Sequence, residues 1–566
     1  MAARGLAGEL ARLEALRWTF GKAAARERRA RLARVLRFRL PSAAAVERLH
    51  ELLLAARAYP DDRATLALAT RALRGFGTRA DVRSHHEALT DSGIAGCDIR
   101  FAFFAPTARR LAARWPQQLE IDWKALESPA SKTALEAWLP LLAHEGEVPG
   151  LDEVDYGLRG WLERMKSPDE ADGAFVARSL AARLQPDEFL FERVHDGLEP
   201  PYRLRGDATT PSRTHDEWPV RTIHFQHEPF AGRPDLARAA ATPPRSVRTL
   251  SASEGERALA LAMSCMVTRG RDLDVFAWGD PRDVRRVDCG DGLEFLMIGA
   301  KPERRLLLES VYGFLSLKNG VPVGYVLTSA LYRSAELAFN VFDTFRGAEA
   351  GPVYGKVIGM TRALFGTDTF TIFPYQLGEG NDEAIESGAW WFYDKLGLRP
   401  RSRIARTIMD LELAAMQRRK GHRSSAATLR KLATHNLYWS LGPHRDDVIG
   451  ELPLPNAGIA ATQLIAKRFA GDRARAAEVC EREAASRLGV RSFAGWSADE
   501  RHAWRRWAPL VTLLPDVPRW SSADRAAATA VIRAKGGPRE DAFVHAFDAH
   551  PSLGAALAKL LRGVRA

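Results

Sequence analysis

Cysteine is scarce in this sequence of 566 residues, and long apolar runs are absent. The four cysteines (Cys97, Cys265, Cys289 and Cys480) lie far apart, without a CxxC pair or a histidine at ligand spacing. Neither a disulfide framework nor a zinc knuckle is indicated, and a reducing cytoplasm is the expected compartment. No window of about 18 residues is apolar and free of charge, so we expect neither a membrane span nor a secretory leader.

The overall composition is that of a globular protein. Hydrophobic residues make up 46% and charged residues 27% of the chain, which excludes collagen-like and wholly disordered proteins. Because a single hydrophobic core stops growing at about 250–300 residues, the length predicts two or three domains.

The net charge of +12 is concentrated at one end. Residues 1–40 hold 11 basic and 3 acidic side chains, leaving little excess in the rest. We therefore expect a basic helix over residues 17–39. A solvated helical face is the simpler interpretation, and binding of nucleic acid or an acidic partner is the alternative.

The chain divides into three parts. Residues 1–210 show mainly helical spacing, residues 211–412 mix strands and helices, and residues 413–566 are helical again. A segment rich in Pro, Thr and Arg between about 205 and 250 marks the first boundary. The predicted fold class is mixed α+β, with a central mixed sheet between mainly helical N- and C-terminal domains.

In the central part, Asn319-Gly320 separates two β-rich runs, 306–317 and 321–331, and this dipeptide predicts a hairpin. We also predict strands at 293–299, 334–345, 369–375 and 401–413, and helices at 252–268, at 382–397 and from Pro352 onward. Near residue 345 a strand leads through a glycine-bearing turn into a helix. The free N–H groups and positive end of that helix make it a candidate anion site.

The order of these elements resembles the GNAT superfamily of acyl-CoA-dependent N-acyltransferases. The residues Ala389, Tyr393, Lys395, Gly397 and Leu398 match that family's A-x-x-x-Y-x-K-x-G-F signature, with Leu at the last position. The similarity covers about residues 290–412. It implies a splayed sheet, acyl-CoA (acetyl-CoA) as co-substrate and an amine as acceptor.

The resemblance also implies site residues. The pantetheine arm would pair with the backbone near Asn340, Val341 and Phe342. The R-x-x-G-x-G phosphate loop would fall on residues 346–351, with Arg346, Gly347 and Gly351 at its matching positions. Tyr393 would be the general acid that protonates the leaving thiolate.

Two positions depart from the family pattern. Glu349 replaces the middle glycine of the phosphate loop, and a carboxylate beside a diphosphate is unfavourable. Glu386 stands seven residues before Tyr393, where the family has asparagine, and Asn381 either serves in its place or caps a helix. The alternative to an enzyme is therefore an interaction protein built on a degenerate GNAT core.

A general base is needed to take the proton of the attacking amine. Glu336 is the candidate, because it is out of phase with the apolar Leu337 and Phe339 of the same strand, and Asp343 at the strand's end is the second. The histidines His215, His224 and His227 have no completing carboxylate pattern, so no metal is predicted.

Overall fold

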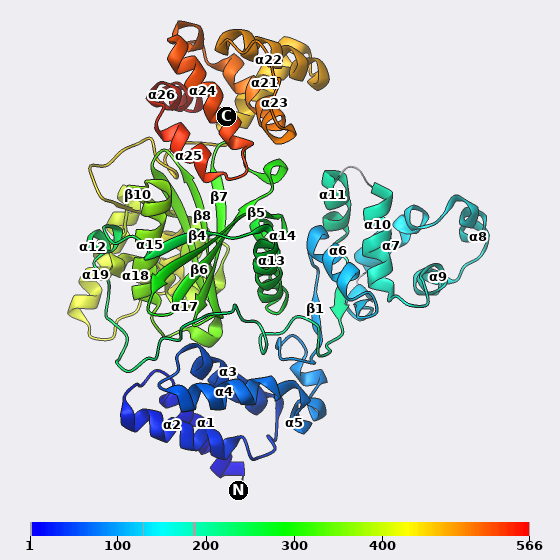
Figure 1. Ribbon diagram of the computed structural model, residues 1–566, viewed down its shortest axis with the longest axis vertical. Helices are drawn as coiled ribbons and strands as arrows, with labels where there is room; N and C mark the ends of the chain where they lie inside the picture. Colours follow the sequence, from blue (N-terminus) through cyan, green and yellow to red (C-terminus); the bar gives the residue numbers. More distant parts are fainter. Residues whose placement is uncertain (1–2, 128, 185–187, 565–566) are drawn as a thin grey trace.

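The computed structural model describes residues 3–127, 129–184 and 188–564 (Figure 1). The first helices form a group of their own at the N-terminal end: α1 (Ala3–Ala15), α2 (Lys22–Val35), α3 (Ala43–Ala58), α4 (Arg63–Arg74) and α5 (Ala80–Ser84). Ser42 caps α3 through the N–H of Ala45, as polar residues at this position commonly do. The basic helix expected over residues 17–39 is shorter in the structure, where α2 covers residues 22–35.

A second group follows within the region expected to be one helical domain. A small antiparallel sheet of order β1-β3-β2 packs there with α6, α7, α10 and α11, and this group lies beside the central sheet in Figure 1. Its elements are β1 (Ile99–Phe101), α6 (Ala105–Arg114), β2 (Leu119–Ile121), α7 (Pro129–Leu142), α8 (Val148–Glu153), α9 (Gly157–Met165), α10 (Asp172–Leu184), α11 (Glu188–Leu198) and β3 (Tyr202–Leu204).

The centre of the molecule is a nine-stranded mixed sheet of order β11-β12-β10-β9-β8-β7-β6-β5-β4. All neighbours are antiparallel except β9 and β10, which are parallel and joined by a crossover through α15 (Ala350–Phe365). The strands are β4 (Ser246–Thr249), β5 (Gly279–Gly290), β6 (Leu293–Ala300), β7 (Ser310–Lys318), β8 (Val321–Leu331), β9 (Ser334–Val341), β10 (Thr369–Ile372), β11 (Arg399–Pro400) and β12 (Leu437–Ser440).

The two faces of this sheet are buried by different helices. One apolar cluster joins alternate residues of β7–β9, such as Tyr312 and Leu337, with α12 (Leu236–Ala240), α15 and α18 (Ala389–Leu396). The other joins residues such as Leu315 with α13 (Ala252–Val267), α14 (Asp274–Ala277) and the N-terminal helices. Alternation along most of β7–β9 therefore decides which side chains face which layer.

The C-terminal helices pack against one end of the sheet (Figure 1). They are α21 (Asn456–Phe469), α22 (Arg473–Leu488), α23 (Ala498–Leu513), α24 (Ser522–Lys535), α25 (Asp541–Asp548) and α26 (Pro551–Gly563). Buried polar groups cross this interface: Arg285 of β5 donates to Asp541 at 2.7 Å, and the N–H of Asp541 donates to the hydroxyl of Tyr312 of β7 at 2.8 Å. The C-terminal unit is thus attached both by a continuous apolar cluster and by buried polar contacts with the sheet.

The hairpin at Asn319-Gly320 is confirmed, with Lys318 opposite Val321. Both turn residues have positive φ, 50° and 81°, as a two-residue type I′ turn requires. The Asn319 side chain is buried and donates to the carbonyls of Ala58 and His224 at 2.8 and 2.9 Å. The turn therefore also joins the sheet to α3 and to the segment after residue 210.

Because of these contacts, Asn319→Ala is expected to lower the free energy of unfolding by about 2–4 kcal/mol, through lost buried hydrogen bonds and strain at positive φ. Asn456→Ala serves as the control, since Asn456 also donates to backbone carbonyls but lies in α21. Denaturant unfolding of both variants checks the prediction, and an equal small loss in the two would contradict it.

Other expectations about secondary structure were wrong. Residues 401–413 are not a strand: Ser402 caps α19 (Arg403–Arg418), whose buried Ala405 and Met409 stand four residues apart. The helix expected over 382–397 is two helices, α17 (Asp382–Ser387) and α18, because Gly388 adopts a left-handed conformation with φ 68°. The sheet extends past the boundary expected at residue 412, since β12 inserts between β10 and β11.

Candidate functional site

Strands β9 and β10 separate shortly after they begin to pair. Their parallel register covers only three residue pairs, from Ser334–Thr369 to Glu336–Thr371. Beyond this point β9 continues to Val341 with β8 as its partner, while the chain leaves β10 and enters α16 (Pro374–Leu377). The sheet is therefore open between β9 and the segment that follows β10.

A cavity of about 610 Å³ lies at this opening. Its floor is one face of β7–β9, and its walls come from the turn after α13, the segment before β7 and α16–α17. The lining residues that carry the argument below are Arg271, Glu309, Tyr325, Glu336, Asn340 and Glu383. A concave site with an apolar floor and a few polar groups has the character of a ligand site.

Glu336 faces this cavity, on the side of β9 opposite Leu337 and Phe339. Burial is the main cause that raises its pKa to about 7, and the nearby charge of Glu309 adds to it. A carboxyl group with a pKa near neutrality can accept a proton at physiological pH. Asp343, the other candidate base, is exposed, pairs with Arg346 at 2.8 Å and does not line the cavity.

Asn340 lines the same cavity two strand positions beyond Ala338. Its Oδ1 is buried and has no hydrogen-bond partner among the residues that the structure describes. Such an unsatisfied acceptor is costly unless a ligand donates to it. Val341 ends β9, and the following Phe342 is buried beneath the guanidinium of Arg269, 3.7 Å from its ring centre.

Two arginines meet one carboxylate at the mouth of the cavity. Arg271 donates to the hydroxyl of Tyr325 at 3.2 Å and lies 3.5 Å from Glu383. Arg346 binds the other oxygen of Glu383 and also Asp343. Asn381 lines the cavity as well, but its Oδ1 accepts from the N–H of Ala384, so it caps α17.

Tyr393 does not line the cavity. Its ring packs with Tyr354 at 5.7 Å on the face covered by α15 and α18. Burial raises its pKa well above the ordinary value, and a hydrogen bond from the backbone of Phe339 partly offsets this effect. The phenol thus lies beside the part of β9 that β10 leaves unpaired.

The glycine-bearing loop contains an unexpected ion pair. Glu349 turns towards the sheet and accepts from Lys318 at 2.7 Å. Burial and the nearby Glu349 carboxylate raise the pKa of Tyr59, which directly follows α3. The Lys318 side chain is 1% exposed and that of Glu349 17%. Gly347 has φ 84° beside Trp18, and Gly351 lies against Pro234.

The cationic side chains of the N-terminal helices are largely paired within the protein. Arg28 is buried against Asp61, and its neighbours along α2 contact carboxylates of α1, α2 and the start of α4. These pairs are Arg29–Asp62, Arg31–Glu9, Arg31–Glu27 and Arg34–Glu9. Most of these arginines therefore pair with carboxylates of neighbouring helices, and among the described residues they do not form one exposed basic face.

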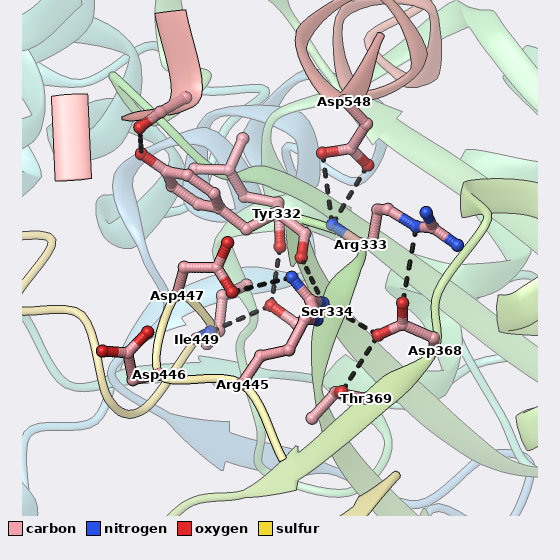
Figure 2. Close-up of polar contacts among 12 residues, drawn as sticks. Tyr332, Arg333, Ser334, Asp368, Thr369, Arg445, Asp446, Asp447, Ile449 and Asp548 are labelled. Carbon is pink, nitrogen blue, oxygen red and sulfur yellow. Dashed lines mark hydrogen bonds and ion pairs between the residues drawn. The ribbon is translucent and has the colours of Figure 1, made fainter. Parts of the chain in front are cut away.

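A larger cavity, of about 1260 Å³, lies at the Tyr332–Arg333 turn next to the C-terminal helices. Figure 2 shows that several polar groups around this turn are bonded to one another. Arg445 donates to Tyr332, Asp368 and Asp447, and Asp548 accepts from the backbone of Arg333. The Asp548 contact joins the turn between β8 and β9 to the C-terminal unit, and we take the smaller cavity as the candidate site.

Three findings concern metal binding, membrane-spanning helices and the cysteines. Within the described residues, no group of His, Cys, Asp and Glu is arranged to hold a metal ion. No helix in the same part of the chain is long and apolar enough to cross a membrane. All four cysteines are buried and free, and burial raises the pKa of Cys265 well above its ordinary value.

Comparison with known proteins finds no match among family models, curated proteins or solved structures. The function is therefore argued from the geometry of the cavity. The sequence indicated Glu336, Asn340 and Asn381, which the fold brings to one cavity. It did not indicate Arg271, Glu309, Glu383 or Lys318, because their partners lie far away along the chain.

Proposed function

We propose that this protein is an acyltransferase that moves an acyl group from acyl-CoA to an amine in the cavity beside β9. The observation that carries the proposal is the position of Glu336, a carboxyl group with a pKa of about 7 at the point where β9 and β10 separate. The parallel β9–α15–β10 crossover and the separation of its strands support it, because the GNAT resemblance implies such a splayed sheet.

The donor would lie along β9. From Glu336 to Asn340 the strand rises about 13 Å, which leaves room for an extended pantetheine arm. The unpaired Oδ1 of Asn340 can accept from an amide N–H of that arm. At the mouth, Arg271 and Arg346 would exchange Glu383 for the diphosphate, which guanidinium groups bind well.

The acceptor would approach from the end where Glu309 and Glu336 line the cavity. Glu336 takes a proton from the ammonium form of the amine, and the free nitrogen attacks the thioester carbonyl. A C–N bond forms, the C–S bond breaks and the nitrogen releases its second proton to solvent, giving a neutral amide and the CoA thiolate. The thiolate takes up a proton from solvent, because Tyr393, the general acid that the resemblance implies, lies on the other face of the sheet.

The mouth of the cavity gives a direct test of donor binding. We expect Arg271→Met to weaken CoA binding about tenfold, since a charge-assisted hydrogen bond is lost. We expect Glu383→Gln to strengthen it several-fold, because both arginines lose their competing carboxylate. Calorimetric titration with CoA measures both effects.

Pantetheine is the matched control ligand, because it lacks the diphosphate. Its affinity should not change in either variant. If both variants leave CoA affinity unaltered, the arginines do not bind the phosphates. If the unaltered protein binds neither CoA nor acetyl-CoA, the acyltransferase proposal fails and an interaction protein on a degenerate core becomes the better explanation.

A further inference from the structure

The C-terminal unit holds the segment that lines one end of the cavity. Successive residues before β7 are bonded to it: Arg305 donates to the carbonyl of Lys535 at 2.8 Å, and Trp507 donates to the carbonyl of Leu307 at 3.0 Å. The buried Lys535 donates to the carbonyl of Glu309 at 2.8 Å. The backbone that carries Glu309 is therefore held by α23 and α24.

The side chain of Glu309 faces the cavity and is half-buried. Within the part of the chain that the structure describes, its carboxylate has neither an ion pair nor a hydrogen bond. Lys535, which donates to the backbone carbonyl of Glu309, is occupied by the carboxylate of Glu540 at 2.5 Å and by backbone carbonyls. A negative charge thus lines the cavity without a partner from the protein.

Glu309 and Glu336 belong to the same face of the sheet. Glu309 precedes Val311 by two positions, Val311 lies opposite Ser329, and Ser329 lies opposite Glu336. The other charged groups that line the cavity lie elsewhere: Arg271 and Glu383 pair at its mouth, and Asp272 accepts from Phe104 and Thr107. The end with two carboxylates therefore suits a ligand with more than one positive charge.

We propose that the acceptor is a diamine or another amine with a second cationic group, and that Glu309 binds this second cation. The inference rests on the proposed acyl transfer. The reacting nitrogen then lies at Glu336, where it gives up its proton, while the second ammonium stays charged at Glu309. The C-terminal unit thereby contributes to the choice of substrate through the backbone of residues 305–310.

The test compares diaminobutane with butylamine on the full-length protein, by calorimetric binding without acyl donor and by acetyl transfer from acetyl-CoA. We expect diaminobutane to bind 10- to 100-fold more tightly, the range for one hydrogen-bonded ion pair. Glu309→Gln should remove this preference and leave butylamine binding nearly unchanged. Glu303→Gln is the matched control, because Glu303 is exposed on the same segment but does not line the cavity.

The outcomes separate this inference from the proposed function. If the unaltered protein binds the two amines equally well, the inference is overturned, and this comparison requires no variant. A preference that survives Glu309→Gln also overturns it, even if acetyl transfer is observed. Diaminobutane binding that depends on Glu309 without any acetyl transfer supports the cation site and overturns the acyltransferase proposal.

Discussion

Replacing Glu336 with glutamine is expected to slow acyl transfer by about 10²–10⁴-fold, the usual contribution of a positioned general base. The affinity for CoA should not change, because the amide occupies the same volume and lies away from the arginines at the mouth. Steady-state rates with diaminobutane and acetyl-CoA, with calorimetry for CoA, measure both quantities.

The same substitution should change how stability depends on pH. The pKa of Glu336 is raised from 4.5 to about 7 in the folded protein, so the group favours folding below about pH 4.5. That contribution is lost as the pH rises to about 7. Relative to the unaltered protein, Glu336→Gln should therefore gain up to about 3 kcal/mol between pH 4 and pH 8. Denaturant unfolding at several pH values checks this.

Glu386→Gln is the control for both measurements, since Glu386 is exposed on α17. It should leave the rate and the pH profile unchanged. An active Glu336→Gln enzyme would exclude Glu336 as the base. A pH profile equal to that of the unaltered protein would show that its carboxyl group titrates normally.

Lys318→Met should be the most destabilising single substitution considered, at about 3–5 kcal/mol. It would leave the Glu349 carboxylate in the loop before α15 without its cation, beside the hydroxyl of Tyr59. Removing one partner of a buried ion pair costs more than removing both, because the remaining charge stays desolvated. Denaturant unfolding of the variant measures the loss.

The double substitution Lys318→Met with Glu349→Gln should recover much of the lost stability, and Lys395→Met, at an exposed lysine of α18, should change little. A double variant as unstable as Lys318→Met alone would show that packing of the lysine stem matters, not its charge. For the same reason, placing the family's glycine at this position with Glu349→Gly would leave Lys318 buried without a partner.

Local sequence signals predicted the parts of the fold that depend on a few neighbouring residues. The Asn319-Gly320 turn needs only two residues that tolerate positive φ, and the Ser42 cap needs one hydroxyl at a helix start. The orientation of Glu336 followed from alternation along one strand. Residues 401–413 form helix α19 and not the strand that the sequence predicts. A short amphipathic stretch can match the periodicity of either a strand or a helix, and its tertiary contacts decide between the two.

The sequence by itself determined the central hairpin, the strand that carries Glu336 and the helical character of both flanks. Only the tertiary structure decided that β12 inserts between β10 and β11, that Glu349 pairs with Lys318, and that Lys535 holds the backbone of Glu309. The physical reason is distance along the chain. Turns and caps form among residues already adjacent, whereas a contact between residues 309 and 535 exists only after both segments have packed on the same sheet.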